Sequence, residues 1–141
     1  MQPAYKMSNP QEAYRKQGVL TASPLELIIM LYDGCRKKLM LAQRAIAKNE
    51  VEVAHTHMIR SQDIISELIN CLDLSLPLSK ELFELYEFMI HAITQANISK
   101  DAQALDPILE MLGTLRDTWR EVSEMPRDVV ALQEDGEDED G

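Results

Sequence analysis

Few residues of this chain could do chemistry, and their spacing argues against a metal site. Glu52 followed by His55 is the one Glu-x-x-His pattern, whereas a di-iron helix bundle needs two such motifs and two further inward glutamates. His55 and His57 are two residues apart and therefore lie on diverging faces of a helix, and His91 lies on a polar face. We expect all three histidines to be solvated, with no metal and no cofactor.

The motifs that build many catalytic sites do not occur in the sequence. It has neither a glycine-rich phosphate loop nor a Gly-x-Ser-x-Gly nucleophile elbow, and it has only five glycines. Cys35 lies on an apolar helical stripe and Cys71 lies at the end of another, so we expect both thiols to be small buried hydrophobes in a reducing compartment. The sequence therefore predicts a protein that is not an enzyme.

Composition fits one domain with a substantial core, since the 141 residues are 45% hydrophobic and 27% charged. The formal net charge is -10, but six acids lie in the last eight residues, so the body is only mildly acidic. An acidic body without a basic patch argues against nucleic acid as a partner. Without a signal sequence or an apolar run of about 20 residues, we expect no membrane insertion and a cytoplasmic protein.

Apolar residues recur at helical spacing in four segments, which predicts an all-α, antiparallel four-helix bundle. The first helix begins with a capping box, in which Ser23 precedes Pro24 and Glu26, and ends near residue 48. Asn49 is expected to cap a second helix that ends near residue 72, and Ser79 to begin a third. A fourth helix is expected to be capped by Asp101 and to end at Pro126.

Two residues interrupt the expected helices. Pro107 removes a backbone donor in the fourth helix and predicts either a kink or a short helix followed by a restart. Gly34, in the middle of the first helix, predicts a close approach by a neighbouring helix or a bound segment. The expected organisation is an extended or partly helical N-terminal segment (1–22), a bundle (23–126) and a disordered acidic tail (127–141).

The first and third helices have more apolar surface than one bundle seam can use. The expected seam of the first helix consists of Ile28, Leu31, Cys35, Leu39, Ala42 and Ile46. Leu25, Ile29, Tyr32 and Met40 flank this seam on one side, and Leu27, Met30 and Leu41 on the other. In the third helix a second stripe of Phe83, Tyr86 and Ile90 lies beside the seam. Such helices are either buried on several sides or form a groove for partner helices.

Several stretches of the chain resemble the FliS family of flagellin export chaperones, from about residue 9 to residue 122. They are Ala13-Tyr14, Val19 to Pro24, Leu31 to Gly34, Leu85 to Met89 and Leu115 to Trp119. Each motif alone is short, but their order and spacing together are specific. Gln11 departs from the pattern, because family members often have an aromatic residue there, and this predicts a weaker N-terminal cover.

The resemblance implies a cytoplasmic helical bundle without catalytic activity. Such chaperones hold the disordered C-terminal segment of flagellin in hydrophobic grooves, prevent premature polymerisation and support delivery to the flagellar type III export gate. The N-terminal segment can fold back over the groove when flagellin is absent. The resemblance leaves open whether an anti-sigma factor or a co-chaperone also binds, and whether the acidic tail shields the groove or contacts the export gate.

The resemblance and the surplus apolar surface together nominate site residues. The predicted flagellin-binding groove consists of Leu27, Met30, Tyr32, Phe83, Tyr86 and Ile90. The predicted cover or second contact surface consists of Tyr14, Val19 and Leu20. The alternative for each groove residue is core packing, and Tyr32 and Tyr86 could place their rings in the core and their hydroxyls at its rim. Trp119 is expected in the core. The competing function is a structural or regulatory bundle that self-associates through the same stripes.

Overall fold

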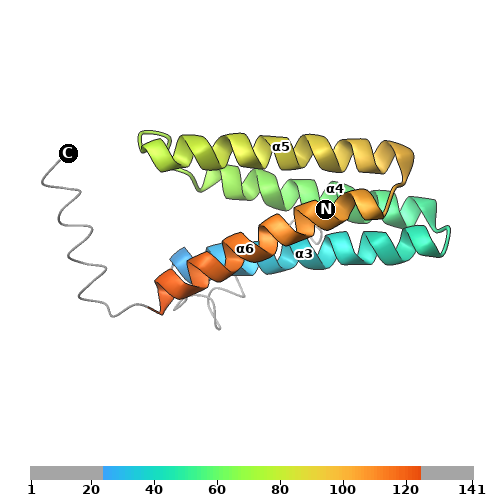
Figure 1. Ribbon diagram of the computed structural model, residues 1–141, viewed down its shortest axis with the longest axis horizontal. Coiled ribbons are helices and arrows are strands. Elements are labelled where there is room, and N and C mark those ends of the chain that lie inside the picture. Colours follow the sequence, from blue (N-terminus) through green and yellow to red (C-terminus); the bar gives the residue numbers. More distant parts are fainter. Residues whose placement is uncertain (1–23, 125–141) are drawn as a thin grey trace, which may run out of the picture.

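The computed structural model describes residues 24–124 and confirms the predicted antiparallel bundle of four helices (Figure 1). The elements are α3 (Pro24–Ala47), α4 (Val51–Asn70), α5 (Pro77–Ser99), the 3-10 turn η2 (Gln103–Leu105) and α6 (Asp106–Ser123). No strand occurs between residues 24 and 124. The predictions for the N-terminal segment, for the Ser23 cap and for the acidic tail lie outside the described residues.

The core lies between all four helices, and α3 contributes most to it. The predicted seam is correct for Cys35, Leu39 and Ala42, which are fully buried. The predicted seam is wrong for three other residues, which are only partly buried: Ile28, Leu31 and Ile46. Tyr32, which was predicted to flank the seam, has no exposed surface. The physical reason is that α3 packs against both α4 and α6, so its buried face is wider than one seam.

The turn between α3 and α4 corrects the role expected of Asn49. Asn49 adopts a left-handed backbone conformation with φ 59°, and the N-cap of α4 is Glu50, which makes no capping side-chain hydrogen bond. The Glu50 amide donates to the Ala45 carbonyl at 2.8 Å and the Asn49 amide donates to the Ile46 carbonyl at 3.0 Å. These two bonds form a Schellman motif, so Asn49 ends α3 instead of starting α4.

The start of α5 also differs from the prediction. Pro77, not Ser79, is the first residue of α5, and Leu76 before it is extended. Proline suits this position because its fixed φ is helical and no intrahelical partner is needed for its nitrogen. Ser79 is instead buried in the first turn of the helix.

Between α5 and α6 the chain restarts, which is one of the two outcomes expected from Pro107. The Asp101 carboxylate accepts hydrogen bonds from the amides of Gln103 (3.1 Å) and Ala104 (3.3 Å), and thereby caps η2. α6 then begins at Asp106 with Pro107 in its first turn, where a missing donor costs no intrahelical bond. The prediction that Asp101 caps the fourth helix is wrong, because the N-cap position of α6 is Leu105 and the Asp101 carboxylate binds the turn before the helix.

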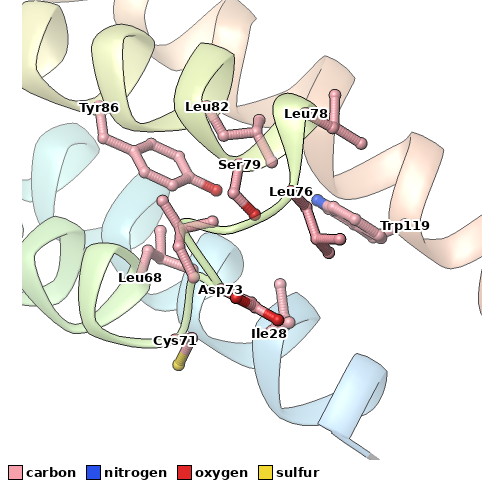
Figure 2. A pocket seen from close by; sticks show the side chains of 11 residues that line it. Ile28, Leu68, Cys71, Asp73, Leu76, Leu78, Ser79, Leu82, Tyr86 and Trp119 are labelled. Carbon is pink, nitrogen blue, oxygen red and sulfur yellow. The ribbon is translucent and has the colours of Figure 1, made fainter. Parts of the chain in front are cut away.

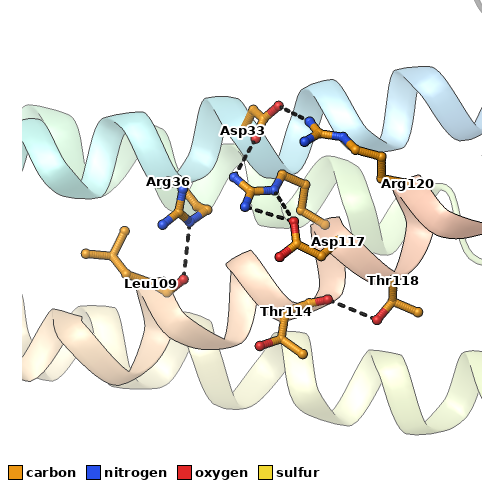
Figure 3. Close-up of polar contacts among 8 residues, drawn as sticks. Asp33, Arg36, Leu109, Thr114, Asp117, Thr118 and Arg120 are labelled. Atoms are coloured by element: carbon orange, nitrogen blue, oxygen red, sulfur yellow. Dashed lines mark hydrogen bonds and ion pairs between the residues drawn. The ribbon is translucent and has the colours of Figure 1, made fainter.

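Polar contacts fix α6 against α3 along its whole length. The Gln43 amide donates to Asp106 Oδ1 at 2.7 Å, and Arg36 Nε donates to the Leu109 carbonyl at 3.3 Å. Toward the other end, Asp33 accepts hydrogen bonds from Arg116 at 3.2 Å and from Arg120 at 3.4 Å (Figure 3). These partly exposed ion pairs add little stability, but they set which face of α6 meets α3. The opposite face of α6 is therefore directed toward α5.

The pairing of the four helices is uneven. α3 packs closely on α4 and α6, and α4 packs on α5, whereas the neighbouring helices α5 and α6 have few close contacts. Figure 1 shows α6 crossing α3 and diverging from α5 toward the start of α5. Within residues 24–124 no helix is long and apolar enough to cross a membrane.

We predict that Gly34→Ala stabilises the protein. A Cβ atom at Gly34 would lie 3.7 Å from Ile64 Cδ1 of α4, which is ordinary van der Waals contact. α4 therefore approaches closely but leaves room for a methyl group, and the free energy of unfolding should rise by up to about 1 kcal/mol in a urea titration. Gly113→Ala is the matched control. Its Cβ atom would lie 3.4 Å from Arg36 Nε, so this variant should gain less free energy of unfolding. A loss of stability in Gly34→Ala would contradict this packing.

Candidate protein-binding groove

A cavity of about 240 Å³ lies at the end of the bundle where the α4–α5 loop passes α3 and α6 (Figure 2). We call it the end cavity; its lining is predominantly apolar and comes from all four helices and the loop. The lining residues are Ile28, Leu68, Cys71, Leu72, Asp73, Leu76, Leu78, Ser79, Leu82, Tyr86 and Trp119. The cavity exists because α5 and α6 diverge at this end of the bundle (Figure 1) and leave part of the core between them uncovered.

A second, more open depression of about 410 Å³ runs between α5 and α6. We call it the α5–α6 groove; it is lined by Leu85, Pro107, Glu110, Met111, Thr114 and Leu115. Leu85 lies one turn from Leu82 on α5, and Leu115 lies one turn before Trp119 on α6, so the residues that line the two depressions lie on adjacent turns of both helices. From Pro107 to Trp119 the combined apolar strip is about 18 Å long, which matches about 12 residues of helix.

Large apolar side chains border this strip and remain exposed to solvent. Leu78 is 57% exposed and Leu76 is 46% exposed at the mouth of the end cavity. Phe88, three residues after Leu85 on the same side of α5, is 51% exposed. Several large exposed apolar side chains beside a depression are typical of an interaction site.

Two tyrosines and the single tryptophan connect the end cavity to the core. The hydroxyls of Tyr32 and Tyr86 hydrogen bond to each other, and Trp119 Nε1 donates to the Tyr32 hydroxyl at 3.1 Å. Burial is the main reason that the pKa of each tyrosine is raised, so both phenols stay neutral and able to donate. Trp119 is partly buried against the core and also lines the cavity, so it is a boundary residue and not the interior residue expected.

The structure does not bring together the six residues that were predicted to form one groove. Tyr32 and Tyr86 lie in the core, as the alternative interpretation held, although Tyr86 also contacts the end cavity. The other four lie outside both depressions and are partly buried or exposed; they are Leu27, Met30, Phe83 and Ile90. Their contact with a partner stays a prediction. Tyr14, Val19 and Leu20 lie outside the described residues.

Sequence analysis missed the loop and α6 residues of the site. Leu74, Leu76 and Leu78 fall in the segment assigned as a helix break, and each is about half exposed. Three leucines at alternate positions in a short break are a usable signal, because a connecting loop seldom needs so much apolar surface. Met111 lies beside the apolar residues Ile108, Leu112 and Leu115, which recur at helical spacing, and no sequence pattern distinguishes its groove role from core packing.

The chemistry-bearing side chains do not gather at this site. Between residues 24 and 124 no group of three or more His, Cys, Asp or Glu side chains could hold a metal. His55 is exposed and its Nδ1 pairs with the Asn97 amide at 2.9 Å, and His91 is exposed, whereas His57 is half-buried. Desolvation, assisted by the charges of Lys38 and Arg60, lowers the pKa of His57.

The fold and the groove together define a helical protein-binding bundle. Residues 7–126 match the family described as flagellar protein FliS, and the chain belongs to this family. The family consists of flagellar secretion chaperones and is not an enzyme family, which confirms the resemblance seen in the sequence. Membership implies a flagellar client protein in general.

Curated relatives match most of the chain. The flagellar secretion chaperone FliS of Bacillus subtilis (strain 168) is 35% identical over 121 residues, covering 86% of this chain and 91% of the relative. That of Salmonella typhimurium (strain LT2) is 29% identical and covers 77% and 82%. A crystal structure of a flagellar chaperone from bacteria has a TM-score of 0.69 and covers 83% of this chain and 97% of that chain. At 19% identity it supports the fold alone.

We predict that one thiol reacts in the native protein. Cys71 is exposed at the rim of the end cavity, which corrects the expectation that it is buried, because α4 ends at Asn70 and leaves it at the start of the loop. Cys35 is fully buried, and burial raises the pKa of its thiol to about 12. Labelling with a disulfide reagent at pH 8 should therefore modify Cys71 rapidly and Cys35 only after unfolding. Equal labelling of both thiols in folded protein would contradict the structure.

We also predict that Tyr32→Phe destabilises the protein more than Tyr86→Phe. The first change leaves the Trp119 indole and the buried Tyr86 hydroxyl without their partner, whereas the second leaves Tyr32 paired with Trp119. An unpaired buried hydroxyl costs about 1–3 kcal/mol, and removing both hydroxyls should recover part of that loss. Urea titrations of the two single variants and the double variant measure this, and additive losses would contradict the hydrogen-bonded pair. Trp119 emission should shift in Tyr32→Phe and stay unchanged in Tyr86→Phe.

Proposed function

We propose that this protein is a cytoplasmic chaperone that holds the C-terminal segment of flagellin in the α5–α6 groove and the end cavity. The observation that supports this most is the apolar strip formed by the two neighbouring depressions at α5 and α6, in a chain that belongs to the flagellar secretion chaperone family. An amphipathic helix of the client would supply the contacts that α5 and α6 do not make with each other. Holding the segment prevents premature polymerisation and keeps flagellin ready for the type III export gate.

The physical properties of the strip fit a client that folds as it binds. Ordering a disordered segment costs several kcal/mol, so the site must bury a long apolar stripe of the client. The groove offers Met111 and Leu115 along α6 and Leu85 along α5, and the end cavity accepts a larger apolar side chain beside Trp119. Met111 adds a flexible side chain that can adapt to the client surface.

The N-terminal segment is the proposed occupant of the strip when flagellin is absent. Tyr14, Val19 and Leu20 supply apolar side chains within ten residues of Pro24, where α3 begins at the same end of the bundle as the cavity residue Ile28. Such a cover would hide the exposed leucines of the loop and would be displaced by the client. Leu27 and Met30, near the start of α3, would then contact the cover or the client beyond the strip.

The test is a titration with a peptide that copies the C-terminal segment of flagellin from the same organism. We expect saturable 1:1 binding by calorimetry, a gain of helix by circular dichroism and a negative heat-capacity change. Met111→Ser should weaken binding at least about tenfold, because it removes an apolar anchor from the groove.

Ile98→Ser is the matched control for this titration. Ile98 is 73% exposed and also lies on α5, but it is not part of the groove or the end cavity. The affinity of the Ile98→Ser variant for the peptide should stay within about twofold of the affinity of the unchanged protein. Equal losses in both variants would place the client elsewhere. Absence of micromolar binding, together with a stable dimer, would favour the self-associating bundle.

A further inference from the structure

The described helices have a basic face on α3 and the adjoining edge of α4, which corrects the expectation that the body of the protein has no basic patch. We define this basic face by Lys37, Lys38, Arg44 and Arg60. Lys37 and Arg44 are seven residues apart on α3 and therefore share one exposed side of the helix. Lys38 of α3 and Arg60 of α4 both lie close enough to His57 to act on its charge, which places them at the edge between the two helices.

The four cations of the basic face are available for a partner. The ion pairs among residues 24–124 involve Arg116 and Arg120 with Asp33 and Asp117, and none involves the basic face. Three of its four side chains are exposed, and Lys38 is half-buried. An unpaired cluster of this kind raises the local positive potential and attracts acidic segments.

The other side of the bundle repels such segments. α5 has Glu81, Glu84 and Glu87 on its exposed surface, and Glu110 of α6 lines the α5–α6 groove. An acidic polypeptide is therefore directed away from the groove and toward the basic face. α4 also has exposed acids, namely Glu52, Asp63 and Glu67, so the excess of positive charge lies mainly on the exposed side of α3.

The chain itself contains a matching acidic segment. Beyond α6 its acids include Glu134, Asp135, Glu137, Asp138, Glu139 and Asp140. The end of α6 lies beside α3, because Arg120 contacts Asp33 at 3.4 Å. From Asp33 to Arg44 is about 17 Å along the helix axis, and ten residues of unstructured chain also span about 17 Å on average. Glu134, ten residues after Glu124, can therefore reach the basic face.

We propose that residues 134–140 dock on the basic face of their own chain. Each exposed ion pair is weak, but several pairs form together, and tethering gives the tail a high effective concentration at the face. The contact is electrostatic and therefore weakens as salt screens it. In this arrangement the tail covers the basic face and leaves the α5–α6 groove open for its client.

Zero-length carbodiimide cross-linking of the full chain tests this proposal, since it joins carboxylates only to amines within contact distance. At low ionic strength, peptide mapping should find residues 134–140 joined mainly to Lys37 and Lys38 of the same molecule. Lys80 and Lys100 serve as internal comparisons, because they lie on or next to α5. Raising the salt to about 0.5 M should remove the preference.

Charge reversal that spares the reactive lysines makes the test specific. The double variant Arg44→Glu, Arg60→Glu keeps both amines but reverses half of the basic face, so the yield at Lys37 and Lys38 should fall about fivefold. Lys80→Glu changes charge on α5 and should leave that yield unchanged. Cross-links spread evenly over all lysines, formed mainly with Lys6 or Lys16, formed only between two molecules, or insensitive to the double variant would overturn the proposal. Flagellin binding is measured separately and does not depend on this outcome.

Discussion

The attachment of α6 to α3 is the constraint on which the rest of the structure depends. A fourth helix could close a bundle symmetrically against both neighbours, but here Gln43, Arg36 and Asp33 hold successive turns of α6 against α3. With this face of α6 against α3 and with Ile108 and Leu112 buried in the core, the apolar residues Met111 and Leu115 on the remaining side of α6 are not fully covered by another helix. The α5–α6 groove follows from this asymmetry and not from a missing element.

The end cavity has a different physical origin. α4 ends at Asn70 and α5 begins at Pro77, so the loop between them passes across the end of the bundle with leucines at alternate positions. The hydroxyl pair of Tyr32 and Tyr86 fills the core beneath it, and the indole of Trp119 is oriented by its bond to Tyr32. A rigid polar base under an apolar opening allows a client side chain to enter without rearranging the core.

The helices, their order and the restart near Pro107 could be predicted from the sequence, because helical periodicity and the chemistry of caps and prolines act locally. The prediction that Asn49 caps α4 was wrong because asparagine suits both an N-cap and a left-handed turn, and only the path of the chain decides between them. The groove could not be located from apolar stripes alone. On α5 the stripe at Phe83 and Ile90 and the side with Leu85 and Phe88 are equally apolar, and only the position of α6 determines which one borders a groove.

Oxidative footprinting of methionines with and without bound flagellin tests the central claim most directly, namely that the client occupies the strip between α5 and α6. Met111 lies in the groove, whereas Met40 is exposed on α3, has no proposed contact with the client and provides the internal reference. The account predicts that flagellin slows the oxidation of Met111 and leaves Met40 unchanged. Protection of Met30 and Met40 with unchanged oxidation of Met111 would place the client on α3 and contradict the account.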